Sequence, residues 1–308
     1  MAHGKPLLSP LRYPGSKRRL VGYIKQALEI NGLRPALYVE PFVGGASVAL
    51  QLMQEGLVGQ VILADIDPWI ASFWQTVFFD TDWLVEQIWT VKVTLDKWHE
   101  FKQSNPTTRR DQALTCFFLN RTNFSGILQA KVGPLGGRIQ QSDYKIDCRF
   151  MRDTLTKRIE QAATHKEKVA AVWCCSWKEA IAGVRERQGQ VALPTDGTFF
   201  YFDPPFFEEA EALYRYYFGS KDHRALRDHL LDLEEKWILS YDSAQQVEAL
   251  YGKALRQRTN GTQKHDVELY YSLAIMSEER RKGKEVIISN LKQLPVPEVN
   301  TQKKRARR

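Results

Sequence analysis

Short apolar runs alternate along this chain with stretches in which apolar residues recur every three or four positions. The short runs have the pattern of buried β-strands, and the longer spacing has the pattern of amphipathic helices. Strands are predicted at residues 37–40, 61–67, 169–173, 199–202, 237–241, 269–275 and 286–289. The first helix is predicted to run through Leu20, Ile24 and Leu28, with Ser16 as its N-cap. Strands that alternate with helices in this way are typical of an open α/β sheet.

The middle of the chain has a different pattern. Residues 70–110 and 113–119 carry apolar residues at helical spacing, and no strand is predicted there. From residue 127 to residue 149 this periodicity disappears, and glycine and basic residues are dense. A loop of this length inside a compact chain usually has a function. We therefore predict one domain from residues 1–70 and 165–300, interrupted by a mainly helical insertion at 71–164.

The two ends of the chain are predicted to carry little structure. Residues 1–10 precede the first periodic stretch and are expected to form a loose arm. Five of the eight residues at 301–308 are lysine or arginine, and this stretch is expected to form a disordered tail.

The composition suggests a nucleic acid as partner and argues against a metal or a membrane. The net charge is +8, which favours association with a polyanion. The four cysteines form no CxxC pair, and the histidines do not supply zinc-ligand spacing, so we expect a reduced cytoplasmic protein without a metal. No apolar run is long enough to cross a membrane, so no membrane partner is expected.

The most informative stretch is the aromatic run at 199–202 and the Asp-Pro-Pro-Phe turn that follows it. The prolines restrict the backbone, so the strand ends in a stiff turn. This turn presents the carboxylate of Asp203, the backbone carbonyl of Pro204 and the ring of Phe206. Two acceptors and a stacking surface suit a flat ring that carries an amine. Alternatively, the aspartate caps the turn and Phe206 belongs to the core.

Two further strands end in features of a nucleotide-type site. The strand that ends at Glu40 leads into a turn with Phe42 and Gly44, and a tight glycine turn allows a ligand to approach the backbone closely. Asp65 ends the next strand about 20 residues later, where a carboxylate binds ribose hydroxyls. No full dinucleotide or triphosphate motif is present, which favours an adenosine-bearing ligand. Lys17 precedes a predicted helix and suits an anion, or lies in a solvated basic turn.

The segment from residue 120 to the end of the long loop carries the side-chain types that bind DNA. Lysine and arginine meet phosphates, whereas arginine, asparagine and glutamine read base edges. An aromatic residue in this segment suits insertion into the base stack. Alternatively, the segment is a polar surface insertion. The predicted DNA-binding residues are Asn120, Arg121, Asn123, Phe124, Ser125, Gln129, Lys131 and Arg138.

These motifs, in this order, resemble the Dam-like, α-group DNA adenine methyltransferases over nearly the whole chain. The resemblance rests on five motifs, which are Arg-Tyr-Pro-Gly-Ser-Lys at 12–17, Tyr-Val-Glu-Pro-Phe-Val-Gly-Gly at 38–45, Ala-Asp-Ile-Asp at 64–67, Phe-Leu-Asn-Arg at 118–121 and Asp-Pro-Pro-Phe at 203–206. It implies a Rossmann-like class I methyltransferase sheet with an inserted target-recognition domain at 71–164. It also implies S-adenosylmethionine as methyl donor and the N6 of a flipped adenine in double-stranded DNA as acceptor.

The resemblance also assigns the candidate residues, with two departures from the family's pattern. Carried over by position, the residues expected at the cofactor are Tyr13, Lys17, Glu40, Phe42, Gly44, Asp65 and Asp203, and those expected at the reacting amine are Asp203, Pro204 and Phe206. Phe206 stands where the family usually has tyrosine. Gln129 and its two preceding residues stand where the Dam enzymes carry a guanine-reading arginine, which leaves the recognition sequence open.

Two alternatives to this activity remain. One is a related amino-methyltransferase that acts on the N4 of cytosine or on RNA adenine. Another is a nucleic-acid-binding protein without catalytic activity. A monomer of bacterial or phage origin is the expectation that accompanies the resemblance.

Overall fold

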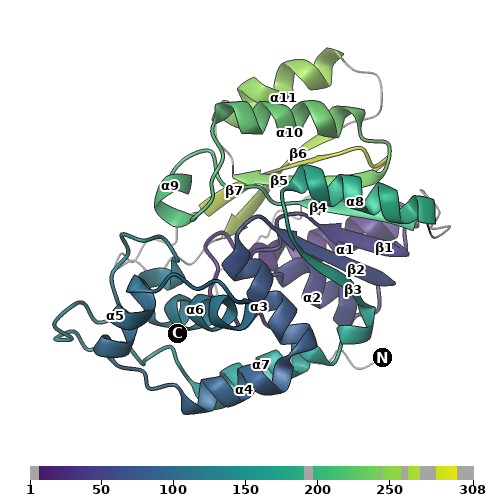
Figure 1. The fold of residues 1–308 in the computed structure, drawn as a ribbon. Helices are drawn as coiled ribbons and strands as arrows, with labels where there is room; N and C mark the ends of the chain where they lie inside the picture. Colours follow the sequence, from purple (N-terminus) through teal and green to yellow (C-terminus); the bar gives the residue numbers. More distant parts are fainter. Residues whose placement is uncertain (1–6, 191–196, 243–244, 258–262, 271–281, 297–308) are drawn as a thin grey trace, which may run out of the picture.

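The computed structural model describes residues 7–190, 197–242, 245–257, 263–270 and 282–296. Within these residues the chain forms a seven-stranded sheet in the order β3-β2-β1-β4-β5-β7-β6 (Figure 1). The strands are β1 Leu37–Glu40, β2 Gln60–Asp65, β3 Val169–Cys174, β4 Thr198–Phe202, β5 Lys236–Asp242, β6 Gln263–Tyr270 and β7 Lys282–Ser289. The first five strands pair in parallel, whereas β7 is antiparallel to both β5 and β6.

The predicted α/β sheet is confirmed, and most of the predicted strands lie where the sequence placed them. The exception is the strand predicted at 269–275, because β6 ends at Tyr270 and residues 271–281 lie outside the described part of the chain. The predicted tail at 301–308 also lies outside it.

The aromatic run of β4 is buried on both of its faces. Phe199 and Tyr201 belong to the apolar cluster on one side of the sheet, and Phe200 and Phe202 belong to the cluster on the other side. Successive side chains of a strand point to opposite faces, so a strand covered on both faces needs an uninterrupted apolar run. This is why the run shows no alternation with polar residues.

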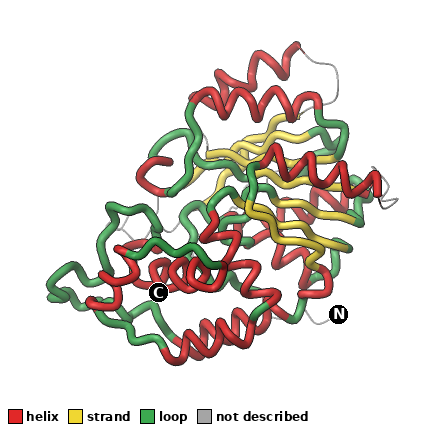
Figure 2. Tube along the Cα trace, viewed as in Figure 1, coloured by secondary structure: helices red, strands yellow, loops and turns green. Residues whose placement is uncertain are grey.

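Helices cover both faces of the sheet (Figure 2). On one side the core includes residues of α1 (Val21–Ile30), α2 (Ser47–Gln54) and α3 (Pro68–Phe79). On the other side it includes residues of α8 (Trp177–Gln190), α10 (Ser220–Asp232) and α11 (Gln245–Gln257). The Asp-Pro-Pro-Phe turn at 203–206, which we call the catalytic turn after its predicted role, therefore leaves the middle of a sheet that is packed on both sides.

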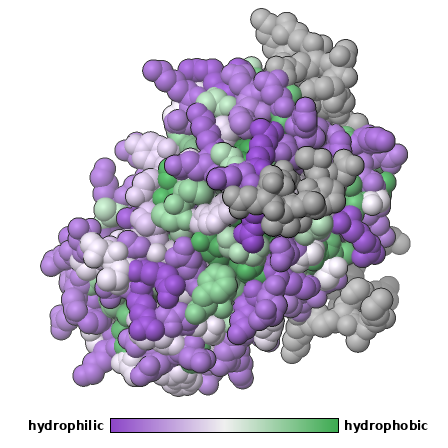
Figure 3. All heavy atoms as spheres, turned by 45° about the vertical axis from the view of Figure 1, so that its right-hand side comes forward, coloured by the Kyte–Doolittle hydropathy of each residue, from purple (hydrophilic) through white to green (hydrophobic). Residues whose placement is uncertain are grey.

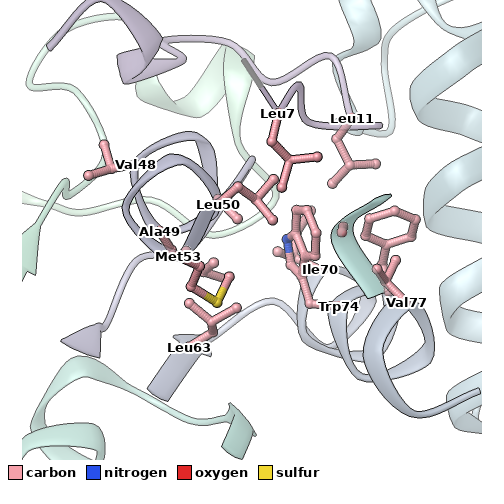
Figure 4. Packing of buried hydrophobic residues seen from close by; sticks show 14 of the residues in the cluster. Leu7, Leu11, Val48, Ala49, Leu50, Met53, Leu63, Ile70, Trp74 and Val77 are labelled. Atoms are coloured by element: carbon pink, nitrogen blue, oxygen red, sulfur yellow. The ribbon is translucent and has the colours of Figure 1, made fainter. Parts of the chain in front are cut away.

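The N-terminal segment differs from the predicted loose arm. Leu7 and Leu11 are buried and point toward Leu50 of α2 and Trp74 of α3 (Figure 4). The predicted N-cap is also wrong: the chain enters α1 through a 3₁₀ turn, Lys17–Leu20, and Ser16 makes no capping hydrogen bond. Its hydroxyl instead lies 2.9 Å from that of Ser47 at the start of α2.

The middle of the chain is helical, as predicted. It contains α4 (Thr81–Thr90), α5 (Leu95–Gln103), α6 (Arg109–Thr122) and α7 (Arg152–Ala163), which lie together beside the sheet in Figure 1. The predicted boundary between residues 70 and 71 falls inside α3, which packs against both α6 and β3. α3 therefore connects the helical part directly to the sheet.

Candidate active site

The carboxyl ends of β1, β2 and β4 surround a pocket that opens to solvent. Ligand sites of open α/β sheets form at this edge. The residues that line the pocket include Tyr13, Ser16, Lys17, Glu40, Phe42, Gly44, Gly45, Asp65, Ile66, Tyr201, Asp203, Tyr214, Tyr217 and Phe218. All seven residues predicted to bind the cofactor are among them, so the fold brings together side chains that are far apart in the sequence.

Asp203 follows directly on β4, and one of its oxygens is held from two sides. Its Oδ1 lies 3.0 Å from Nζ of Lys17 and accepts a hydrogen bond of 3.0 Å from the hydroxyl of Ser240 on β5. The Ser240 hydroxyl also lies 2.8 Å from that of Tyr201. Burial raises the pKa of Asp203, and Lys17 and Ser240 oppose this by stabilising the carboxylate. Among the described residues no hydrogen bond reaches Oδ2, which leaves this oxygen for a substrate.

Lys17 is a buried cation with several acceptors around it. Only 4% of its surface is exposed, and its Nζ donates to the carbonyl of Gly15 at 2.9 Å and lies 3.7 Å from Oε1 of Glu285. Burial lowers the pKa of Lys17, but the carboxylates of Asp203 and Glu285 outweigh burial, so the pKa is raised. The ammonium group therefore stays charged beside the catalytic turn.

The glycine turn after β1 is joined to the acid at the end of β2. The backbone N–H of Gly44 donates to Oδ2 of Asp65 at 3.0 Å, and the N–H of Asp67 donates to Oδ1 at 3.0 Å. Burial and the charge of Asp67 raise the pKa of Asp65 to about 7, although these N–H bonds favour the carboxylate. Each oxygen keeps a further lone pair for a ligand hydroxyl.

Glu40 lines the same pocket and also serves the fold. Its Oε1 accepts hydrogen bonds from the hydroxyl of Tyr38 at 2.6 Å and from the backbone N–H of Ala49 in α2 at 3.0 Å. Burial raises the pKa of Glu40 to about 8, because these two bonds offset only part of the cost of desolvation. The residue therefore couples the end of β1 to the first turn of α2.

The ring of Phe206 is half-buried beside Lys17 and is not among the residues that line the pocket. Its centroid is 5.1 Å from Nζ of Lys17 and 5.8 Å from the ring of Tyr214. Gly15 has a φ of +72°, and a Cβ there would lie 2.5 Å from the Phe206 ring. Glycine at position 15 therefore permits the N-terminal motif and the catalytic turn to approach each other closely.

The pocket fits S-adenosylmethionine, the cofactor that the resemblance implies. Asp65 supplies acceptors for ribose hydroxyls, and the next side chain, Ile66, is 45% exposed and offers an apolar surface. The turn at Gly44 has a φ of +42°, and a Cβ there would lie 2.6 Å from Cε1 of Tyr13. The space beside the turn is therefore shaped by Tyr13 packed directly on glycine.

We expect Gly44→Ala to weaken cofactor binding at least about tenfold. A non-glycine residue at this positive φ costs about 1–2 kcal/mol, and the new methyl group displaces Tyr13 from the pocket wall. Calorimetric titration with S-adenosylhomocysteine measures the affinity. Gly22→Ala is the matched control, because a Cβ at Gly22 meets nothing within 4 Å. Equal affinity of both variants would contradict this description of the turn.

Three of the predicted DNA-binding residues, Asn120, Arg121 and Asn123, lie in the interior. Asn120 and Asn123 are fully buried. Asn120 exchanges hydrogen bonds with the backbone of Arg12, and Oδ1 of Asn123 accepts from Nε1 of Trp98 at 2.7 Å. Asparagines whose groups are bonded inside the protein position the surrounding chain rather than read bases.

The other predicted residues of this segment are more accessible. Phe124 is 54% exposed, and Lys131 and Arg138 are also exposed. Ser125 has a φ of 55°, which is unusual for serine, and such backbone strain is often found at functional sites. Gln129 is half-buried, and its side-chain amide contacts the segment that follows the catalytic turn. Their contact with DNA stays a prediction.

Arg121, the remaining member of the set, belongs to a group of positive charges that the sequence did not identify. We call Arg12, Arg121, Arg149 and Arg158 the arginine cluster. Burial and the other three guanidinium groups lower the pKa of Arg121. No carboxylate pairs with these four side chains in the part of the chain that the structure describes, and Nη1 of Arg12 and Nε of Arg121 are buried there without a hydrogen-bond partner.

The cluster was missed because its members lie in three separate segments of the sequence. Arg12 lies in the N-terminal motif, Arg121 ends α6, Arg149 ends the long loop and Arg158 lies in α7. The only signal of the arginine cluster in the sequence is the high density of arginine in the segments that contain its members. Two of these guanidinium groups donate to backbone carbonyls of the N-terminal segment, Arg121 to that of Pro10 and Arg158 to that of Ser9 at 3.3 Å.

The sheet order, the reversed β7 and the pocket at the carboxyl ends of the parallel strands define a class I methyltransferase fold. Comparison with known families identifies the group more closely. The family of D12 class N6 adenine-specific DNA methyltransferases matches residues 13–273, and this chain belongs to that family.

A curated relative agrees with this assignment. The type II methyltransferase M.MjaIII of Methanocaldococcus jannaschii is 28% identical over 133 residues, which cover 38% of this chain and 46% of the relative. The match therefore spans about half the length of that protein.

The described residues contain neither a membrane-spanning helix nor a cluster of metal-binding side chains. No helix among them combines the length and the apolar character that crossing a bilayer requires. Within the same residues, no group of three or more histidine, cysteine or acidic side chains is arranged to hold a metal ion.

Proposed function

We propose that this chain transfers a methyl group from S-adenosylmethionine to the exocyclic N6 of an adenine flipped out of double-stranded DNA. The observation that carries the proposal is the carboxylate of Asp203, whose Oδ1 is held by Lys17 and Ser240 at the edge of the pocket while Oδ2 faces no hydrogen-bond donor among the described residues. We further propose that the enzyme acts as a monomer in the cytoplasm.

The chemical problem is that an exocyclic amine is a poor nucleophile. Its lone pair is conjugated into the ring and is available only when the nitrogen becomes more tetrahedral. Oδ2 of Asp203 and the carbonyl of Pro204 can accept the two N–H bonds of the amine and favour that geometry. Acceptors that are already in place also stabilise the positive charge that develops on the nitrogen. Lys17 opposes the rise that burial causes in the pKa of Asp203 and so favours the carboxylate, which is the stronger acceptor.

Residues at the carboxyl ends of the parallel strands would hold the cofactor and the flipped base. Asp65 and the turn at Gly44 would hold the cofactor, with Tyr13 as a wall of its site. S-adenosylmethionine supplies an electrophilic methyl group on its sulfonium when it is bound. The ring of Phe206 would stack on the flipped base, because the N6 of adenine cannot be reached by an active site while the base is paired.

Positively charged side chains outside the pocket support DNA as the substrate. The arginine cluster offers guanidinium groups that no carboxylate neutralises within the described residues, and Lys131 and Arg138 add exposed positive charge. On the face drawn in Figure 3, hydrophilic side chains predominate. Phosphate contacts of this kind fix the position of a duplex, whereas base edges determine the sequence that is read.

We expect Phe124→Ala to lower kcat/KM on duplex DNA roughly tenfold to hundredfold, because stacking of an aromatic ring on a base contributes about 1–3 kcal/mol. The loss should be smaller on a substrate whose target adenine is mismatched, since less unpairing is then needed. Phe79→Ala is the matched control, because Phe79 is similarly exposed, at 52% against 54%. Equal losses on paired and mismatched targets would contradict insertion into the stack.

The function itself is tested by expressing the chain in a host that lacks DNA methylation. We expect N6-methyladenine in a defined plasmid sequence and none with Asp203→Ala. Nucleoside analysis separates this product from N4-methylcytosine, and methylated RNA would indicate the RNA alternative. If soluble, folded protein binds DNA but methylates no nucleic acid, the proposal is wrong and a binding protein is the better description.

A further inference from the structure

Residues 209–218, which we call the cover segment, follow the catalytic turn and form one wall of the pocket. The segment contains the short helix α9 (Ala210–Leu213), which projects between the sheet and the helical part in Figure 1. Tyr214, Tyr216, Tyr217 and Phe218 line the pocket. The side chain of Arg215, which lies between Tyr214 and Tyr216 in the sequence, instead contacts Asp67 and Trp69.

Arg215 joins the cover segment to the start of α3. Its Nη1 lies 2.5 Å from Oδ1 of Asp67, and its guanidinium lies 3.6 Å from the centroid of the Trp69 ring. An arginine that combines an ion pair with stacking on an aromatic ring is held in position and orientation. Both partners are largely shielded from solvent, with 23% of the Arg215 side chain and 9% of the Asp67 side chain exposed.

The contact leads directly to the acid of the cofactor pocket. Oδ1 of Asp67 also accepts from the N–H of Trp69 at 2.9 Å, so the carboxylate caps α3. The N–H of Asp67 donates to Oδ1 of Asp65 at 3.0 Å. A single short path therefore connects the cover segment, through Arg215 and Asp67, to the carboxylate expected to bind ribose.

The opposite side of the cover segment is fastened to the predicted recognition loop. Nε2 of Gln129 donates to the carbonyls of Glu211 at 2.9 Å and Tyr214 at 3.3 Å. The hydroxyl of Tyr214 donates to the carbonyl of Pro14 at 3.3 Å. Movement of the recognition loop would therefore be transmitted to the wall of the cofactor pocket.

We propose that Arg215 is a positioning residue that holds the cover segment over the cofactor, and that Gln129 couples this segment to the recognition loop. Cofactor retention then depends on the state of the DNA-binding loop. The inference rests on the proposed function only in taking an S-adenosyl ligand as the occupant of the pocket. Arg215 does not touch the reacting atoms and acts through Asp67, Trp69 and the aromatic wall.

The first test compares Arg215→Gln and Arg215→Lys with Arg185→Gln. Arg185 forms a two-bond pair with Glu235, with both distances 3.0 Å, and neither residue lines the pocket. Affinity and release of S-adenosylhomocysteine are measured by calorimetry and stopped flow, and methyl transfer by single turnover at saturating cofactor. We expect Arg215→Gln to raise Kd and the release rate at least tenfold while the single-turnover rate changes less than threefold. Arg215→Lys keeps the charge without the planar group and should be intermediate.

Two outcomes would overturn the role of Arg215. One is a Kd within twofold of that of the wild type. The other is that cofactor affinity and single-turnover rate fall equally in Arg215→Gln and that Arg185→Gln shows the same falls. A loss of folded protein would produce that pattern. Absence of any S-adenosyl binding by folded wild-type protein would instead overturn the proposed function.

The second test addresses the coupling. The Kd of S-adenosylhomocysteine is measured with and without unmethylated duplex DNA. This DNA contains the sequence that the enzyme methylates. In the wild type we expect DNA to change this Kd at least threefold. In Gln129→Leu we expect the fold-change caused by DNA to be less than half of the wild-type fold-change. Gln103→Leu, at an exposed position of α5, is the control. A wild-type Kd that DNA leaves unchanged, or an unchanged ratio in Gln129→Leu, would overturn the coupling.

Discussion

Asp203→Asn is expected to lower the single-turnover rate of methyl transfer by about 10²- to 10³-fold or more, while the protein still binds duplex DNA. The amide has the same shape as the carboxylate but carries no charge, so it is a weaker acceptor for the N–H of the substrate amine. It also leaves Lys17, 3.0 Å from Oδ1 in the wild type, without its nearest countercharge. The rate is measured with labelled cofactor, and DNA binding is measured separately by fluorescence anisotropy.

The control for Asp203→Asn must separate lost chemistry from lost stability. Glu235→Gln breaks the ion pair with Arg185, in which the glutamate is only 5% exposed and the arginine side chain is 47% exposed. Removal of one partner from a buried pair can destabilise a protein by about 3–5 kcal/mol, so both variants need a thermal unfolding measurement. We expect transfer per folded molecule to stay within threefold of wild type in Glu235→Gln. Substantial transfer by folded Asp203→Asn would contradict the assigned role of this carboxylate.

Lys17→Met is expected to slow methyl transfer at least tenfold at neutral pH. It is also expected to move the acidic limb of the pH–rate profile to higher pH. The active form of Asp203 is the carboxylate. Burial raises its pKa, and Lys17 opposes that rise, so removal of the ammonium group raises the pKa of Asp203 further. Activity should therefore be lost at a higher pH as the solution is acidified. A nearby opposite charge shifts a pKa by about 1–3 units, which sets the size of the expected displacement.

The pH–rate profile of kcat distinguishes this effect from a general loss of structure. If Lys17 contributed only to folding, its replacement would lower the fraction of active protein but would not move the acidic limb of the profile. Lys25→Met is the control, because Lys25 pairs with Glu55 outside the active-site pocket. We expect the Lys25→Met profile to overlay that of the wild type. An unshifted limb in Lys17→Met would show that Lys17 does not control the ionisation of Asp203.

Several parts of the site could be predicted because their signals are local. The run of aromatics in β4 and the Asp-Pro-Pro-Phe turn place Asp203 at the end of a buried strand. The glycine turn at Gly44 and the acid at Asp65 end two further strands. Parallel strands place their carboxyl ends at one edge, so these features were expected to meet, and all lie around one pocket.

The errors in the helical part have one physical cause. Polar residue types in 120–123 suggested contact with DNA, but a residue type does not reveal which face of a helix is covered. α6 is packed by α3, by α5 and by the N-terminal segment, so Asn120 and Asn123 form hydrogen bonds inside the protein. The same packing explains why the predicted loose arm is buried at Leu7 and Leu11.

The sequence by itself determined the α/β class, the strands that carry the chemistry and the family to which the chain belongs, because periodicity and short motifs are local properties. Tertiary structure decided which distant charges meet. It placed Lys17 on Asp203 and Arg215 on Asp67, and it brought the members of the arginine cluster together from three segments. Such contacts depend on how elements pack after the chain has folded, and no spacing along the sequence records them.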